Sequence, residues 1–221
     1  MLSKPLSLVR HHMDFSHMTT SFDICAQQLI EAGRFIDQRG WVPATSGNFS
    51  ARLPDGKIAI TASGRHKGHL TPDDILIIDP QGKSLDGRRS SAETLLHTAL
   101  YRRYPNINAV LHPHSPGATL ISRLRSDCVV LEDFELLKAL PGIVTHATRI
   151  EIPIFENNQD IEQLASTVDQ WITRNGDIHG YLIKSHGFYT WGDSVESALR
   201  HLEALEFLFD IELRTAGVTN L

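Results

Sequence analysis

Apolar residues recur at every third or fourth position between residues 22 and 36, and this spacing predicts an amphipathic helix that Gly40 ends. Further helices are predicted over 92–104, 116–124, 133–140, 161–172 and 194–214. Pro105 ends the first of these and Ser194 begins the last. A single helical turn is expected after Thr71, which precedes a proline and two acidic residues.

Short apolar runs bounded by Gly, Pro or Asp lie between these helices and predict strands. The runs cover 48–53, 57–61, 75–79, 107–112, 150–155, 180–185 and 188–192. Pro153 indicates an edge or an end for its strand, because proline cannot donate to a ladder. The strands do not alternate regularly with helices, which favours a three-layer α/β/α or an α+β sheet protein over a barrel of βα units.

Length and the absence of linkers or repeats predict one domain over residues 20–215 of the 221-residue chain. Residues 1–19 are expected to form a flexible extension, in which three histidines (His11, His12, His17) have no assigned role, and residues 216–221 a tail. The leader lacks the apolar core of a signal peptide, and no run reaches the roughly 18 apolar residues of a membrane helix.

Composition narrows the classes of partner. The formal charge of −5 argues against a general grip on nucleic acid or an anionic membrane, while leaving room for a local basic pocket. Two cysteines, Cys25 and Cys128, indicate free thiols in a reducing, cytoplasmic compartment. The 12 histidines are unusual and direct attention to metal binding.

Two histidine motifs follow predicted strands. His112 and His114 are two residues apart, so both imidazoles can point to one face and reach one ion. His186, followed by a glycine, comes after another apolar strand and could supply a third ligand. The alternative is that they are polar surface or hydrogen-bonded core residues. Four others, His97, His146, His179 and His201, have no partner at ligand spacing and are interpreted as structural.

Two turns rich in hydroxyl groups and glycine, Ser46–Ser50 and Thr61–Gly64, could direct backbone N–H groups at an anion. Four basic residues follow the second turn: Arg65, His66, Lys67 and His69. A phosphate site and two ordinary turns beside a solvated basic loop are both consistent with this pattern.

The segment from Ser90 to Glu93 begins a predicted helix. Its S-x-x-E spacing is that of a capping box, with Ser90 as the cap. The same hydroxyls and free N–H groups also suit a phosphate, with Glu93 near the anion as a metal ligand or general base. Downstream, Glu132, Asp133 and Glu135 favour a helix start through its dipole, and one of them could be catalytic.

In their order along the chain, the motifs SGN, TASG, SSAE, HPH and HG resemble those of the class II, zinc-dependent sugar-phosphate aldolase family. The resemblance covers about residues 22–214. Longer strings such as WVPATSGNFSARL and LEDFELLKAL look like the branch of that family that dehydrates a phosphorylated methylthio-ketose. The resemblance implies a three-layer α/β/α fold around a central mixed, largely antiparallel sheet, and a homotetramer with active sites near subunit interfaces.

The resemblance also implies roles for individual residues. The zinc ligands would be His112, His114 and His186, with one Zn²⁺ per subunit. The substrate phosphate would lie among Gly47, Asn48, Ser63, Gly64, Ser90 and Ser91. The catalytic residues would be Glu93 and Glu135, the latter as acid or base of the dehydratases.

The substrate would be a small phosphorylated ketose, and no nucleic acid or membrane partner is expected. Dehydration and C–C cleavage share an ene-diolate, so the zinc and phosphate motifs do not distinguish these two reactions. Three alternatives are considered. These are a dehydratase, an aldolase or epimerase for fuculose-, rhamnulose- or ribulose-type phosphates, and a scaffold protein that has lost catalysis. A tail without tyrosine favours the dehydratase.

Overall fold

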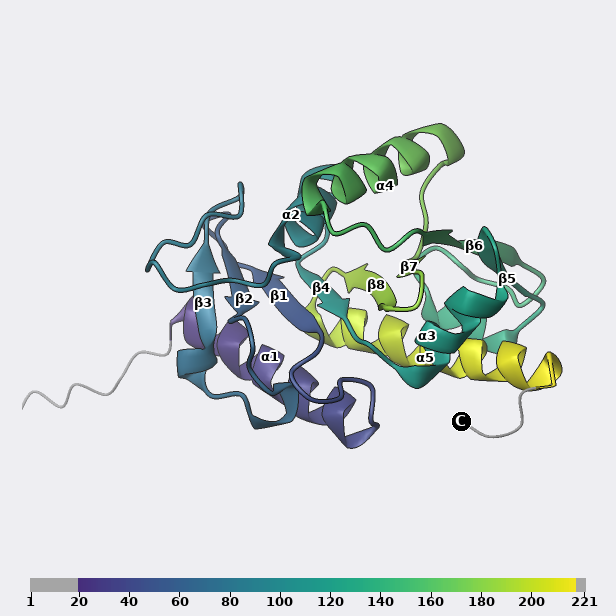
Figure 1. The fold of residues 1–221 in the computed structure, drawn as a ribbon, viewed down its shortest axis with the longest axis horizontal. Helices are drawn as coiled ribbons and strands as arrows, with labels where there is room; N and C mark the ends of the chain where they lie inside the picture. The colour runs from purple at the N-terminus through teal and green to yellow at the C-terminus, as the bar shows by residue number, and fades with distance from the viewer. Residues whose placement is uncertain (1–19, 218–221) are drawn as a thin grey trace, which may run out of the picture.

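A computed structural model describes residues 20–217 and shows helices on both faces of one sheet (Figure 1). The described helices are α1 (Ser21–Gln38), α2 (Thr94–Arg103), α3 (Pro116–Leu124), α4 (Ile161–Asn175) and α5 (Val195–Thr215). The strands are β1 (Asn48–Arg52), β2 (Ile58–Thr61), β3 (Ile75–Ile78), β4 (Ala109–His112), β5 (Cys128–Glu132), β6 (Arg149–Phe155), β7 (Tyr181–Ile183) and β8 (Gly187–Gly192). The predicted extension, with His11, His12 and His17, lies outside the described residues.

The eight strands form one mixed sheet in the order β3-β2-β1-β4-β8-β7-β6-β5. Every neighbouring pair is antiparallel except β6 and β7, which run parallel. The predicted mixed, largely antiparallel sheet is therefore confirmed. Residues far apart in sequence meet at its centre, where β1 and β8 flank β4 and its terminal His112.

Two apolar cores lie on opposite faces of the sheet, because strand residues alternate between the faces. One core packs the sheet against α1, α3 and α5, and the other packs it against α2 and α4 (Figure 1). On β1 and β4, Phe49 and Leu111 belong to the first core, and Val110 belongs to the second. The three-layer α/β/α architecture predicted from the sequence is confirmed.

Local signals begin and end the helices at the expected places. Ser194 accepts a hydrogen bond from the Ser197 N–H and caps α5, and Gly40 adopts a φ of +71° just after α1. A 3₁₀ turn over Pro72–Asp74 forms a capping box with Thr71. None of the described helices is long and apolar enough to cross a membrane. Both Cys25 and Cys128 are unpaired thiols, as expected.

Several predicted elements need correction. Helix α2 begins at Thr94 and not near residue 92, and Ser90 is not its cap, since it pairs with Ala62 in an isolated bridge. The Glu93 side chain is drawn away from the helix end toward the histidines described below. Residues 133–140 form only a 3₁₀ turn, Glu135–Ala139.

Strand β5 was not predicted, although its run CVVLE is preceded by Ser126-Asp127 and followed by Asp133. It occupies the sheet edge in place of β6. Pro153 is tolerated in the interior position because pairing with β7 begins only at the next residue, Ile154.

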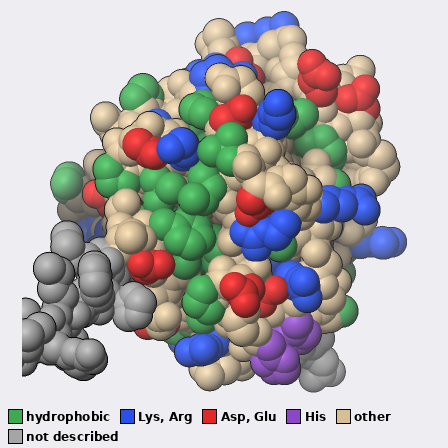
Figure 2. All heavy atoms as spheres, turned by 90° about the vertical axis from the view of Figure 1, so that its left-hand side faces the viewer, with side chains coloured by type: hydrophobic (Ala, Val, Ile, Leu, Met, Phe, Trp, Pro, Cys, Tyr) green, Lys and Arg blue, Asp and Glu red, His purple; other side chains and the backbone are tan. Residues whose placement is uncertain are grey.

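Charged side chains of both signs are interspersed on the face of the molecule nearest β3 (Figure 2). Among the residues that the structure describes, this view shows no broad basic surface of the kind that binds a polyanion. The view agrees with the formal net charge of −5, and an anion site is therefore expected in a local pocket.

Candidate metal and anion site

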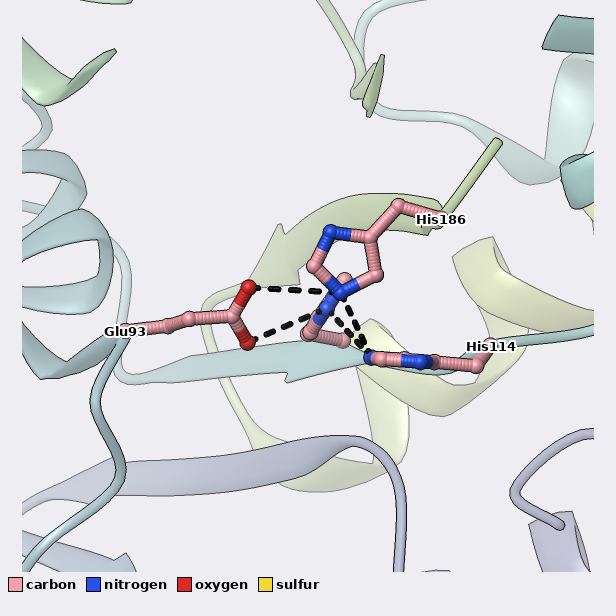
Figure 3. Close-up of side chains that lie close together, drawn as sticks. Glu93, His114 and His186 are labelled. Carbon is pink, nitrogen blue, oxygen red and sulfur yellow. Dashed lines mark hydrogen bonds and ion pairs between the residues drawn. The ribbon is translucent and has the colours of Figure 1, made fainter. Parts of the chain in front are cut away.

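Four side chains converge where β4, α2 and the turn between β7 and β8 meet. They are Glu93, His112, His114 and His186, and their ligand atoms all lie within 4.8 Å of one another. His114 Nε2 is 2.9 Å from His112 Nε2 and 3.0 Å from His186 Nε2. Figure 3 shows Glu93, His114 and His186 pointing toward one another from separate elements. The spacing of two residues predicted the shared direction of His112 and His114, although β4 ends at the first of them.

The backbone fixes which nitrogen of His112 faces the cluster. Its Nδ1 lies 2.8 Å from the carbonyl oxygen of Phe188, to which an Nδ1–H donates. This bond leaves the lone pair of Nε2 directed at the other imidazoles, which is the usual arrangement of a metal-bound histidine. The side chain of His112 is fully buried.

The carboxylate of Glu93 closes the fourth side of the cluster. Its two oxygens lie 3.3 Å from His112 Nε2 and 3.4 Å from His186 Nε2. Burial alone would raise the pKa of Glu93, but the adjoining His112 and His186 and a hydrogen bond from Asn48 hold it well below its usual range. Glu93 is therefore an anion at neutral pH.

The imidazoles of His114 and His186 have lowered pKa values in this setting. Burial, together with the neighbouring His112, lowers the pKa of His114 to about 2 and that of His186 to about 4. Both rings are therefore neutral at pH 7 and carry lone pairs, which is the form that binds a metal ion.

The donor set fits a transition-metal ion. Three imidazole nitrogens and one carboxylate suit zinc and its neighbours in the periodic table. Bonds of about 2.0–2.1 Å in a tetrahedral site would place neighbouring ligand nitrogens roughly 3.3 Å apart. The measured 2.9–3.0 Å is within a few tenths of an ångström of that spacing. Lone pairs this close repel one another unless a proton or a cation lies between them.

A buried chain of hydrogen bonds supports Glu93 from behind. The Asn48 amide donates to Glu93 Oε2 over 2.7 Å, and its oxygen contacts Nε2 of His97. The other nitrogen of His97 lies 2.7 Å from Ser50 Oγ, which lies 2.9 Å from the Tyr101 hydroxyl. Asn48 and Ser50 share a face of β1, since they are two residues apart, and this face meets α2.

His97 is a site residue that the sequence analysis assigned to structure. It is fully buried, and burial lowers its pKa to about 3, so the ring is neutral. The overlooked signal is the spacing of four residues between Glu93 and His97, which places both side chains on one side of α2. The amide nitrogen and the amide oxygen of Asn48 both take part in this chain, so Asn48 supports Glu93 besides lining the cavity.

A cavity of about 320 Å³ opens beside this His/Glu cluster. Its lining includes Ser46, Gly47, Asn48, Ser63, Gly64, Lys67, Ser91, Glu93, His114 and His186. Asn157 and Gln159 line it from the β6–α4 connection, and Ile161 and Leu164 line it from the first turn of α4. The sequence analysis assigned no site role to these four, because nothing local marks them as functional. Gly64 has a φ of +74° and no neighbour within 4 Å of an added Cβ, so its backbone is open to a ligand.

Two predicted site residues lie outside both the His/Glu cluster and this lining. Ser90 is engaged in its bridge with Ala62. Glu135 is exposed and forms ion pairs with Lys138 and, at 3.9 Å, with His146. Its pKa is lowered by the hydrogen bond from Lys138. Within one chain, therefore, Glu93 is the predicted catalytic acid that reaches the cluster.

Curated relatives match nearly the whole chain. A protein from Methylococcus capsulatus named methylthioribulose-1-phosphate dehydratase is 66% identical over 199 residues, which cover 90% of this chain and 98% of the relative. A protein of the same name from Pseudomonas paraeruginosa is 54% identical over 195 residues, 87% of this chain and 95% of the relative.

Solved structures agree on the fold. L-fuculose-1-phosphate aldolase from Thermus thermophilus superposes with a TM-score of 0.70 at 25% identity, covering 90% of this chain and all of that one. Residues 27–213 match the family described as Class II Aldolase and Adducin N-terminal domain. With the converging histidines and the matching fold, these similarities show that the chain belongs to the class II aldolase family.

Proposed function

We propose that the protein is a zinc-dependent dehydratase that converts 5-methylthioribulose 1-phosphate to 2,3-diketo-5-methylthiopentyl 1-phosphate. The observation that carries the proposal is the high identity to relatives named for this reaction, joined to a His/Glu cluster beside a cavity lined by serines and glycines. This reaction would belong to methionine salvage. We also propose that the protein acts in the cytoplasm and forms a homotetramer.

The donor set would hold Zn²⁺ through His112, His114 and His186. When bound, the ion supplies Lewis acidity that stabilises the negative charge formed at the C2 and C3 oxygens as C3 loses its proton. The ionised carboxylate of Glu93 lies beside His112 and His186 and is suited to accept the proton from C3. Asn48 and His97 keep the carboxylate oriented.

Loss of water requires a second proton-transfer group. As the C3–H bond breaks, the C4 hydroxyl leaves with a proton, and the resulting enol becomes the 2,3-diketone. We assign this proton to Glu135. Because its side chain is exposed and outside the cavity of its own chain, Glu135 would act in the cavity of a second subunit.

The assignment of Glu135 can be tested by mixing two inactive variants, Glu135→Gln and His114→Ala. If Glu135 acts across subunits, mixed oligomers contain some sites with both native residues and recover part of the activity. The matched control is Glu132→Gln, another exposed acid nearby, which should retain activity. Full activity of Glu135→Gln alone would refute the assignment, and absence of recovery on mixing would place Glu135 in the site of its own chain.

The second candidate function is cleavage by an aldolase. It is favoured by the likeness to an L-fuculose-1-phosphate aldolase at 25% identity, since the metal and anion motifs would serve both reactions. An aldolase would break the C3–C4 bond and release two smaller products. A dehydratase would keep the carbon chain of the substrate intact and remove one water from it. Mass spectrometry of the product separates the two reactions.

The predicted phosphate-binding residues remain part of this proposal. Gly47, Ser63, Gly64 and Ser91 line the cavity and could direct N–H and hydroxyl groups at one anion. Ser90 would contribute by holding the 62–64 loop through its bridge with Ala62. A Ser63→Ala variant should mainly raise KM, because phosphate binding is largely shared by the ground state and the transition state.

A further inference from the structure

Lys67 is a buried cation beside the proposed substrate cavity. Only 1% of its surface is exposed, although lysine is almost never fully buried without a partner. It begins the 3₁₀ turn Lys67–His69, which α1 holds closely: a Cβ on Gly33 would lie 2.3 Å from the Lys67 carbonyl oxygen. The position of Lys67 is thus set by packing and not by solvent.

The ammonium of Lys67 joins two separate loops. Its Nζ donates to the carbonyl oxygen of Thr45 over 2.9 Å and to that of Arg65 over 2.6 Å. Thr45 directly precedes the Ser46–Asn48 loop, and Arg65 directly follows the loop that ends in Ser63 and Gly64. Both loops line the cavity, so these two bonds fix the distance between them.

Neither bond neutralises the charge. An ammonium has three N–H donors, and two of them are used on carbonyls. No carboxylate of the described residues forms an ion pair with Lys67. Burial lowers its pKa to about 8, so the group remains mostly cationic at neutral pH. A buried charge without a counterion is costly, and an anionic ligand would remove that cost.

The other basic residues of the 65–69 segment are placed differently. Arg65 is exposed and pairs with Asp74 at 3.0 Å, and His66 stacks on His69 with ring centroids 4.5 Å apart. Among the described residues that line the cavity, Lys67 is the one lysine or arginine. The basic cluster seen in the sequence therefore reduces to a single cation at the cavity.

We propose that Lys67 selects a phosphate monoester as the ligand of this cavity, by holding the two loops one phosphate apart and directing its remaining N–H at the anion. The inference deepens the proposed function and rests on it only for the identity of the substrate. Loops held by uncharged hydrogen bonds alone would bind a neutral ligand as well as an anion, whereas a buried ammonium favours the anion.

The test uses inorganic phosphate as the probe and the metal-loaded full chain. Isothermal titration would compare the wild type with Lys67→Met and Lys67→Gln, and the Gln amide retains donors for both carbonyls without the charge. We expect phosphate to bind roughly 10- to 100-fold more weakly to both variants, the range of a charge-assisted hydrogen bond. Lys57→Met, which removes an exposed lysine paired with Asp55, is the matched control and should bind as the wild type does.

Equal phosphate affinity in the wild type and the Gln variant would overturn the proposal and leave Lys67 a structural clamp. If Lys67→Met fails to fold, the Gln variant provides the comparison on its own. Metal content, measured in parallel, shows whether the His/Glu cluster is intact. Because the titration needs no turnover, it decides the role of Lys67 even if the chain fails to dehydrate the proposed ketose phosphate.

Discussion

Gly187→Ala tests how backbone packing sets the metal ligands. Gly187 begins β8 directly after His186, and a Cβ there would lie 2.1 Å from the Pro113 carbonyl oxygen. The same atom would lie 3.2 Å from His112 Cε1 and from His114 Cα. Since real Cβ contacts essentially never fall below 3.0 Å, β8 and the His112–His114 segment must separate by about 1 Å.

A displacement of this size exceeds what a metal site tolerates, because ligand distances are held to about ±0.2 Å. It would also strain the bond from His112 Nδ1 to the Phe188 carbonyl, now 2.8 Å. We expect metal affinity to fall by at least roughly 10- to 100-fold, as for loss of a supporting hydrogen bond. The free energy of unfolding of the metal-free protein should fall by about 1–3 kcal/mol, the usual effect of overpacking.

Competition with a chromophoric chelator would measure the affinity, and circular dichroism would establish that the fold is retained. Gly117→Ala is the matched control, since its added Cβ would meet nothing closer than 3.6 Å. That variant should bind metal normally. Wild-type metal affinity in Gly187→Ala would refute the argument that this close approach sets the ligand geometry.

Three further predictions concern the surrounding groups. Asn48→Leu should lower kcat by roughly 10- to 100-fold while metal content stays normal, because Glu93 loses its amide donor. Steady-state kinetics with metal analysis would show this, and an unchanged kcat would contradict it. The pKa of His186 is lowered to about 4, so proton competition at this ring should weaken metal binding only as the pH falls toward 4. A pH titration of metal content would measure this, and release of the metal by protonation of His186 near the ordinary histidine pKa of about 6.5 would contradict it. Burial raises the pKa of Glu206 from 4.5 to about 8, so between these pH values the folded chain holds a proton that the unfolded chain releases. As pH rises from 5 to 8, the Tm of the wild type should therefore fall relative to that of Glu206→Gln, and a constant difference would show that Glu206 ionises normally.

Periodicity predicted the elements whose signals are local. Capping residues, the glycine after α1 and the apolar stripes placed the long helices, and alternation placed most of the strands. Strand β5 was missed although its apolar run lies between Asp127 and Asp133, and its place at the sheet edge depends on pairing with β6. The interior position of Pro153 could not be predicted either, because it depends on pairing between strands. Strand β6 accommodates this proline because its neighbour β7 is short and pairs only from Ile154 onward.

The convergence of His112 and His114 was predictable, because side chains two residues apart at a strand end can point to one face. The support behind them was not, because it depends on contacts between β1 and α2. Asn48 was predicted as a phosphate residue and does line the cavity, but the sequence did not indicate that its amide also connects Glu93 to His97. Lys67 appeared only as one of four basic residues, since its burial depends on the packing of α1.

The most direct test of the central claim is the product formed from 5-methylthioribulose 1-phosphate by the zinc-loaded protein. Mass spectrometry with ¹³C NMR would identify the product, and zinc-free protein would be the control. We expect one product that retains all five carbons of the sugar chain, is lighter than the substrate by one water and carries adjacent carbonyls at C2 and C3. Dihydroxyacetone phosphate with a two-carbon thioether aldehyde, or an epimer of unchanged mass, would contradict the proposed dehydration.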